Sequence, residues 1–248
     1  MDSKYSLPQD GGLILEGTPK DIIHRYEKIP TSIFEIESQG VEYVAQQIVE
    51  AIHTHNEKNP SRHFKLGLTT GRTPYGIYQE LVKRYEAGEV SFSNVEVYSL
   101  DEFYPIKDTE LQSRNYHIKK NLLDKVDIKP ENVNLIDGTK PIGEVSAYCA
   151  EYERKARNLD LIIIGMGEQG QVGFNEAGSY AKSVTRLVQL SHQSRKAQAN
   201  SFYGIENTPR LAITMGLNTV MSAKRIILVA WGEDKANVVK KVVEGEAT

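Results

Sequence analysis

The stretch DLIIIGMGEQGQVGFNEAG, residues 160–178, decides the fold class. Its first part is a short run of β-branched and apolar residues, as expected of a central parallel strand that helices cover on both faces. Glycines and polar residues follow this run directly. Ligands of parallel α/β sheets sit beyond the carboxyl ends of the strands. The stretch therefore predicts a buried strand that ends at a ligand-binding loop.

The same pattern repeats on both sides of this stretch. We expect further strands at HFKLGL (63–68), VEVYSL (95–100), VNLI (133–136) and RIILVAWG (225–232). Between them, apolar residues recur at helical spacing in residues 40–52, 77–85, 115–126, 144–159 and 236–243. Strands that alternate with helices imply right-handed crossovers. We predict an α/β fold with a doubly wound, mostly parallel, Rossmann-like sheet and helices on both faces.

Length and composition limit the organisation and the partners. The 248 residues suit one large α/β domain, which we place at 29–248 after an N-terminal extension, 1–28, with a short helix at PKDIIHRYEKIP (19–30). No stretch approaches the roughly 18 apolar residues of a membrane helix, and no signal peptide is recognisable. A net charge of −3 argues against nucleic acid. The single cysteine fits a reducing compartment, so we expect a cytoplasmic protein that does not bind membranes.

After HFKLGL, the segment TTGRTP is a candidate phosphate cradle. Gly71 permits a tight turn, Thr73 is a plausible N-cap, and Pro74 suits the first position of a helix. Backbone N–H groups at a helix N-terminus, with the Thr70 hydroxyl and the Arg72 guanidinium beside them, form a good site for phosphate. A well-capped turn without a ligand is the alternative.

Charged residues follow two other strands. Asp101 and Glu102 come directly after VEVYSL, where an acid can transfer a proton or cap the next turn. Lys235 follows RIILVAWG early in a helix, where the helix dipole disfavours a cation, so an anionic ligand or a neighbouring acid is expected there. The histidines lack the spacing of metal ligands, and we expect no metal.

The segment GMGEQG, residues 165–170, matches the dinucleotide fingerprint G-x-G-x-x-G. Two features argue against a nucleotide. The following QVGFNEAGSY does not have a helical pattern, and no Asp or Glu lies between Glu176 and Glu206, where the ribose ligand would be expected. The glycines are more consistent with a loop that approaches a small ligand closely.

These strand ends together resemble the glucosamine-6-phosphate deaminase family, whose superfamily includes 6-phosphogluconolactonases. The resemblance runs from about residue 33 to the last helix. It covers five segments: LGLTTGRTP, EAGEVSFSNVEVYSLDEF, VDIKPENVNLIDG, DLIIIGMGEQGQVGFNEAGS and LAITMGLNTVMSAKRIILVAWGEDKA. The resemblance implies conversion of glucosamine 6-phosphate and water to fructose 6-phosphate and ammonia, without an organic cofactor.

The resemblance also assigns the catalytic residues. Asp101 matches the aspartate that moves a proton between the first two sugar carbons, and Glu176 matches a supporting glutamate. Gln169 and Gln171 stand where the family has an aspartate and the histidine that opens the sugar ring. A glutamine amide has no usable pKa and cannot replace imidazole as an acid or base. Lactonases of the superfamily use the same histidine, so that activity is disfavoured too.

Three hypotheses about function follow. The first is a sugar-phosphate-binding module with little catalysis, which the two glutamines favour. The second is an active deaminase or isomerase in which Asp101 is the base and Gln171 holds a water molecule. The third is another reaction, such as lactone hydrolysis or nucleotide use.

The phosphate site and the chain length also depart from the family pattern. Lys235 matches the family's phosphate lysine, but an arginine usually found after the catalytic loop is missing, and Arg72 is a candidate replacement. Ser179 and Arg186 match allosteric positions of regulated members, whereas their neighbours do not. Because family members usually continue past the last helix, we expect a piece of a longer protein. A fused deacetylase-like domain and a homo-oligomer are both compatible with the resemblance.

Overall fold

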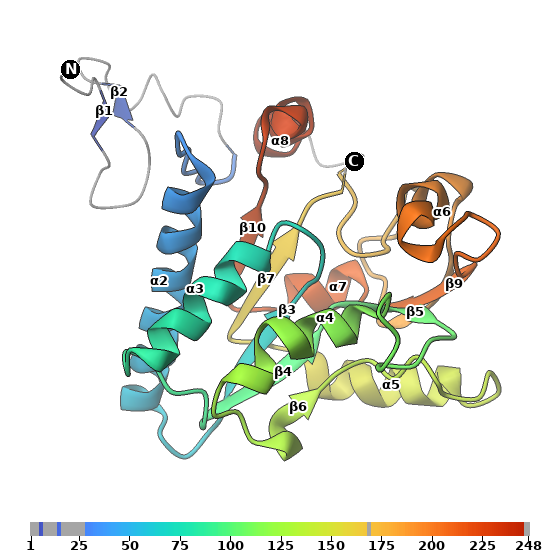
Figure 1. Cartoon of the computed structure of the whole chain (residues 1–248), viewed down its shortest axis with the longest axis horizontal. Coiled ribbons are helices and arrows are strands. Elements are labelled where there is room, and N and C mark those ends of the chain that lie inside the picture. Colours follow the sequence, from blue (N-terminus) through green and yellow to red (C-terminus); the bar gives the residue numbers. More distant parts are fainter. Residues whose placement is uncertain (1–4, 7–13, 16–27, 168–169, 246–248) are drawn as a thin grey trace.

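A five-stranded parallel sheet forms the centre of the molecule (Figure 1), with strand order β10-β7-β3-β4-β6. This computed structural model describes residues 5–6, 14–15, 28–167 and 170–245. The strands are β3 (Phe64–Leu68), β4 (Val95–Ser99), β6 (Val133–Asn134), β7 (Leu161–Gly165) and β10 (Ile226–Val229). The chain runs outward from β3 to β6 and then returns to β7 and β10 on the other side. The predicted doubly wound sheet is confirmed, and its switch point lies between β3 and β7.

Helices connect the strands on both faces of the sheet. They are α2 (Glu37–Lys58), α3 (Tyr75–Glu86), α4 (Arg114–Asn121), α5 (Val145–Ala156), α6 (His192–Gln198), α7 (Leu217–Met221) and α8 (Ala236–Glu244). Short 3-10 turns lie at Leu123–Lys125, Pro130–Asn132, Ala199–Phe202 and Glu233–Lys235. In Figure 1, α2 and α3 lie side by side, and α5 lies across the opposite face of the sheet.

The alternation of buried side chains along β7 explains the two-sided core. Leu161 and Ile163 belong to the cluster that contains the apolar faces of α2 and α3. Ile162 and Ile164 point the other way, into the cluster with α5. Successive side chains of a strand point to opposite faces, so an unbroken apolar run buries both. Gly67 of β3 permits this packing, because a Cβ there would lie 2.5 Å from Ile162.

A second sheet was not predicted. Its three antiparallel strands are β5 (Asp101–Tyr104), β9 (Leu211–Thr214) and β8 (Arg186–Gln189), in the order β5-β9-β8. Leu100 joins the two sheets, since its N–H donates to Leu68 O (2.8 Å) and its carbonyl accepts from Met215 N (2.9 Å). Only Leu100 separates β4 from β5, so the sequence pattern of this region predicts a single strand.

The start of helix α3 differs from the expectation. Helix α3 begins at Tyr75 with Pro74 in the N-cap position and no side-chain cap, so the prediction that Thr73 caps it is wrong. The carbonyl of Thr73 accepts a hydrogen bond from the indole N–H of Trp231.

The helix expected at residues 19–30 lies almost wholly outside the described residues. Before residue 28, the structure describes only a two-residue antiparallel pair, Tyr5–Ser6 with Ile14–Leu15. The division after residue 28 stays a prediction.

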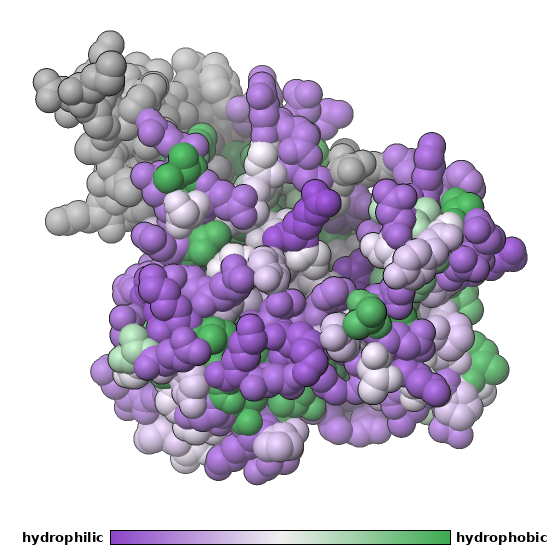
Figure 2. All heavy atoms as spheres, in the orientation of Figure 1, coloured by the Kyte–Doolittle hydropathy of each residue, from purple (hydrophilic) through white to green (hydrophobic). Residues whose placement is uncertain are grey.

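The surface agrees with the composition. Figure 2 shows that hydrophilic side chains dominate the described part of this face, where apolar side chains are scattered rather than gathered. Among the helices that the structure describes, none is both long and apolar enough to span a bilayer.

Candidate functional site

The loops after β3, β7 and β10 meet at the carboxyl edge of the sheet. Trp231, which follows β10, donates its indole N–H to Thr73 O at 2.9 Å. Gly165, the last residue of β7, lies so close that a Cβ there would be 3.7 Å from Thr73. After β7, a Cβ at Gly170 would be 3.2 Å from Val238 of α8. The sequence segments expected to form one site are therefore neighbours.

The predicted cradle presents unused backbone donors. The N–H groups of Gly71, Arg72 and Thr73 make no hydrogen bond to any group in the described part of the chain. Gly71 has φ +110°, a left-handed conformation that favours glycine, and a Cβ there would meet nothing within 4 Å. Three successive free donors at the N-terminus of a 12-residue helix form a site suited to an oxyanion.

Asp101, the first residue of β5, is a buried acid with 2% of its surface exposed. A Cβ on Gly173 would lie 3.0 Å from Oδ2 of Asp101, so the loop after β7 lies directly against the carboxylate. Burial raises the pKa of Asp101, and the nearby Arg114 opposes this rise. A carboxylate with a raised pKa accepts a proton more readily near neutral pH.

Glu102 has the structural role that the sequence left open. Its carboxylate accepts hydrogen bonds from the Ser113 hydroxyl (2.6 Å) and from the N–H groups of Arg114 (3.0 Å) and Asn115 (2.9 Å). It therefore satisfies the first turn of α4, as an acid at a helix N-terminus does. Burial raises the pKa of Glu102, and these hydrogen bonds oppose the rise. Of the two adjacent acids, only Asp101 is left for proton transfer.

Sequence reasoning missed Arg114, which joins the cradle to Asp101. Its Nη1 donates to the Thr70 hydroxyl at 2.6 Å, and its Nε lies 3.3 Å from Oδ1 of Asp101. The guanidinium also lies over the rings of Phe103 and Phe174, 5.0 and 4.5 Å from their centroids. The signal was present in the sequence, because a cation in the first turn of a helix opposes the helix dipole.

The loop after β7 has no following helix in residues 170–185, which removes the pyrophosphate site of a dinucleotide fold. Gln171 packs against Gly167, where a Cβ would lie 2.2 Å from the side-chain amide carbon, and the two residues share a backbone hydrogen bond of 2.9 Å. Gln169 lies outside the described residues.

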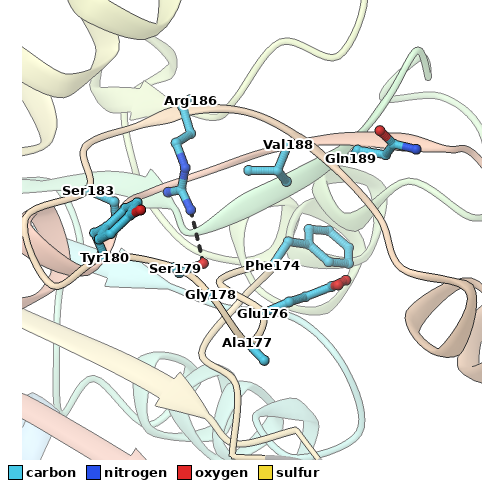
Figure 3. Close-up of a pocket in the computed structure, with 10 residues that line it drawn as sticks. All are labelled: Phe174, Glu176, Ala177, Gly178, Ser179, Tyr180, Ser183, Arg186, Val188 and Gln189. Atoms are coloured by element: carbon cyan, nitrogen blue, oxygen red, sulfur yellow. Dashed lines mark hydrogen bonds between the residues drawn. The ribbon is translucent and has the colours of Figure 1, made fainter. Parts of the chain in front are cut away.

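Glu176 lies on the wall of a pocket of about 300 Å³ that Asp101 does not line. Its carboxylate accepts from the backbone N–H of Ser191 at 3.1 and 3.3 Å. Figure 3 shows Glu176 beside Phe174, while Arg186 donates to Ser179 at 3.2 Å on another side of the pocket. Phe174 therefore separates this pocket from Arg114. Of the predicted site residues that the structure describes, Glu176 lines the pocket and the others do not.

Arg72 is part of the cradle, and Lys235 follows Trp231, which donates a hydrogen bond to Thr73 of the cradle. Arg72 is exposed and Lys235, at the N-terminus of α8, is half-buried. Neither side chain makes a hydrogen bond or ion pair with any described residue. Both are therefore available to an anion. Within the described ranges, no three His, Cys, Asp or Glu side chains gather closely enough to hold a metal ion.

Comparison with known proteins decides the family. The family model for glucosamine-6-phosphate isomerases and 6-phosphogluconolactonase matches residues 35–248. The chain belongs to this family. The resemblance stated from the strand-end motifs is thereby confirmed.

Relatives and solved structures support the assignment to the glucosamine-6-phosphate isomerase family. A putative glucosamine-6-phosphate deaminase-like protein of Bacteroides thetaiotaomicron is 38% identical over 229 residues, which are 91% of this chain but 34% of that protein. The chain thus spans about a third of that relative's length. A glucosamine-6-phosphate deaminase of Halothermothrix orenii is 40% identical over 73% of this chain and 75% of its own length.

A monomeric glucosamine-6-phosphate deaminase structure superposes with a TM-score of 0.80 at 30% identity, covering 87% of each chain. A 6-phosphogluconolactonase of Thermotoga maritima shares the fold, with a TM-score of 0.64 at 20% identity over 82% of this chain and 84% of its own.

Proposed function

We propose that this domain binds an amino-sugar phosphate, with the phosphate on the cradle and the reactive end of the sugar toward Asp101. The observation that carries the proposal is the row of three backbone N–H groups at residues 71–73 that make no hydrogen bond to any described residue, together with two cations, Arg72 and Lys235, that have no partner among those residues. Backbone donors and cations at a helix N-terminus recognise phosphate together. The names of the relatives make glucosamine 6-phosphate the first ligand to test.

We further propose that turnover is slow. Gln169 and Gln171 stand at the positions that the family resemblance assigns to an aspartate and a ring-opening histidine. General acid–base catalysis contributes roughly a hundred- to ten-thousand-fold, and an amide cannot supply it. The buried Asp101 supports a second candidate, a weak deaminase or isomerase, because its raised pKa suits a base that acts on an open-chain sugar.

Calorimetry with glucosamine 6-phosphate and with glucosamine tests the binding proposal. The phosphorylated sugar should bind at least about tenfold more tightly, since several charge-assisted hydrogen bonds depend on its phosphate. Lys235→Met should reduce this preference. Lys240→Met is the matched control, because Lys240 lies on the same helix and pairs with Glu244 at 3.9 Å. Equal affinity for the two sugars would contradict the proposal.

Release of ammonia and fructose 6-phosphate distinguishes the two candidates. The protein should be stabilised by glucosamine 6-phosphate without consuming it, by about 2.7 kcal/mol when the ligand concentration is 100 times its Kd. Turnover at the rate of an active family member would instead establish the deaminase and overturn the proposal of slow catalysis.

A further inference from the structure

Arg114 holds a central position that no catalytic role yet explains. It is the first residue of α4, and 15% of its side chain is exposed. The rings of Phe103 and Phe174 lie against its guanidinium, so its plane is held in place. A cation at the start of a helix is unfavourable by itself. A specific set of acceptors must therefore stabilise it there.

The first acceptor is the hydroxyl of Thr70. Because this oxygen accepts from Nη1 of Arg114 at 2.6 Å, the hydroxyl hydrogen must point elsewhere. No acceptor for that hydrogen is present in the described part of the chain. Thr70 directly precedes the free N–H groups of the cradle. Its hydroxyl can therefore act as a fourth donor to an anion that binds there.

The second partner of Arg114 is the carboxylate of Asp101, which it contacts as an ion pair. Its Oδ1 and the Nε of Arg114 are 3.3 Å apart, yet their alignment is too poor for a hydrogen bond, and both atoms are buried without another partner. The pair attracts electrostatically in a poorly solvated setting while the carboxylate stays unsaturated. A carboxylate in this state keeps its capacity to accept a proton.

Few other groups act on Asp101. From α3, the Tyr78 hydroxyl faces it but donates to Thr69 O at 2.5 Å, and burial raises the pKa of Tyr78, so the phenol stays neutral. From β9 and the loop after β7, the neighbours are Thr214 and Gly173, which do not titrate. Arg114 is thus the cation that faces Asp101 among the described residues.

We propose that Arg114 is a positioning residue that couples the two halves of the site, keeping Asp101 charged while it turns the Thr70 hydroxyl hydrogen toward a bound anion. One rigid guanidinium performs both tasks, because its Nε and Nη1 donors lie in one plane and point in different directions. The Thr70 half rests on the proposed function, since it requires an anion in the cradle. The Asp101 half does not.

Two measurements test the two halves separately. The pKa of the Asp101 carboxyl is followed by carbon NMR, with Asp101→Asn to assign its resonance. Binding of inorganic phosphate and of glucosamine 6-phosphate is followed by calorimetry. Arg114→Met should raise the pKa of Asp101 by about one unit or more, because it removes the nearby opposite charge. It should also weaken phosphate binding by about tenfold, as loss of a charge-assisted donor does.

Three further variants sharpen the result. Thr70→Val should weaken phosphate binding as much as Arg114→Met but leave the pKa of Asp101 unchanged. The double variant should bind no worse than Arg114→Met alone, since the two residues act through one hydroxyl. Arg114→Lys keeps the charge without the planar fork, so it should preserve the pKa of Asp101 but not the phosphate affinity.

Arg84→Met is the matched control for loss of a mostly buried arginine. Arg84 is also 15% exposed, and it pairs with Glu80 on α3 at 3.0 Å, away from the site. Circular dichroism shows whether each variant folds, and Arg114→Gln, which also removes the positive charge, substitutes for Arg114→Met if the latter does not. An unchanged pKa of Asp101 in folded Arg114→Met overturns the Asp101 half alone. Additive losses in the double variant overturn the Thr70 half, whereas no phosphate binding by the unmodified protein overturns that half together with the proposed function.

Discussion

Two buried aspartates, one at each end of the parallel sheet, differ in how fully they are paired. Asp160 precedes β7 at the amino end and accepts from Arg62 at 2.7 and 2.8 Å, from Lys224 at 2.7 Å and from the N–H of Lys65 at 2.9 Å. Asp101 follows β4 at the carboxyl end, and its Oδ1 accepts no hydrogen bond from any described residue.

The two environments move the pKa values in opposite directions. Burial alone would raise the pKa of Asp160, but the hydrogen bonds from Arg62, Lys224 and Lys65 outweigh it and hold the pKa well below its usual range. At Asp101 burial prevails over Arg114, and the pKa rises. A saturated carboxylate stabilises the fold, whereas an unsaturated one keeps the capacity to react. The comparison therefore predicts that Asp160 contributes more to stability and that Asp101 is the better candidate for proton transfer.

The largest expected effect is on catalysis. Gln169→Asp with Gln171→His should raise deaminase turnover by about a hundredfold or more, because an imidazole supported by a carboxylate restores acid–base chemistry. Adding Asp101→Asn should abolish this gain, while adding Asp160→Asn should leave it intact in protein that is still folded. The assay is release of ammonia and fructose 6-phosphate. A gain that survives Asp101→Asn would show that another residue is the base.

The free energy of unfolding should depend more on Asp160 than on Asp101. Asp160→Asn should lower the free energy of unfolding by about 2–3 kcal/mol, a value reduced by the exposure of its cationic partners, 41% for Arg62 and 61% for Lys224. Asp101→Asn should change it by less than about 1 kcal/mol, since the cost of burying the charge offsets the loss of the ion pair. Urea denaturation at about pH 7 measures both. Equal losses would remove the distinction between the two ends.

The contributions of Asp160 and Asp101 to stability should change with pH in opposite directions. The contribution of Asp160 is complete above the ordinary aspartate pKa of about 3.9 and is lost as the pH falls through its lowered folded value. The difference in stability between the unmodified protein and Asp160→Asn should therefore narrow on acidification. The raised pKa of Asp101 contributes stability below about pH 3.9 that is lost as the pH rises through the folded value. Denaturation curves from about pH 7 to about pH 3 should show both trends; a difference for Asp160 that widens on acidification would refute its assigned role.

The smallest expected effect concerns the exposed cation of the cradle. Arg72→Gly should weaken glucosamine 6-phosphate binding by about three- to tenfold, because a solvated guanidinium contributes less than a buried one. Stability should hardly change, since the exposed Arg72 side chain makes no hydrogen bond or ion pair with any described residue. Calorimetry of Arg72→Gly beside Lys235→Met ranks the two cations. Unaltered affinity would show that Arg72 does not replace the family's missing arginine.

The carboxyl end was more predictable from the sequence than the amino end. Hydrophobic patterning located the ends of four strands, and parallel strands bring those ends to one edge, so the sequence indicated that Asp101 and residues 70–73 lie at that edge. Their part in a site stays a prediction. The role of Asp160 depends on Arg62 and Lys224, which are 98 and 64 residues away along the chain. No periodic pattern records such a contact. Arg114 was missed because its role depends on where a guanidinium points.

The antiparallel sheet was also beyond pattern analysis. Its strands have four residues each, and β5 continues from β4 after a single residue. Period-2 alternation cannot separate two strands that are joined so closely. The expectation for Thr73 failed because α3 begins one residue later than the pattern indicates, which puts Pro74 in the N-cap position.

The four hydrogen bonds of Glu102 have a consequence for engineering. One carboxylate fastens both ends of the segment 103–112, since it accepts from Phe103 N (2.8 Å) and from Ser113 and the two residues after it. The path between those ends carries no site residue, and Leu111 near its end is 61% exposed. Insertions between Asp108 and Leu111 should therefore lengthen an external loop while α4 keeps its starting point. This loop is therefore a suitable attachment point for a peptide tag or fluorophore. It lies only a few residues before Arg114, whose guanidinium faces Asp101.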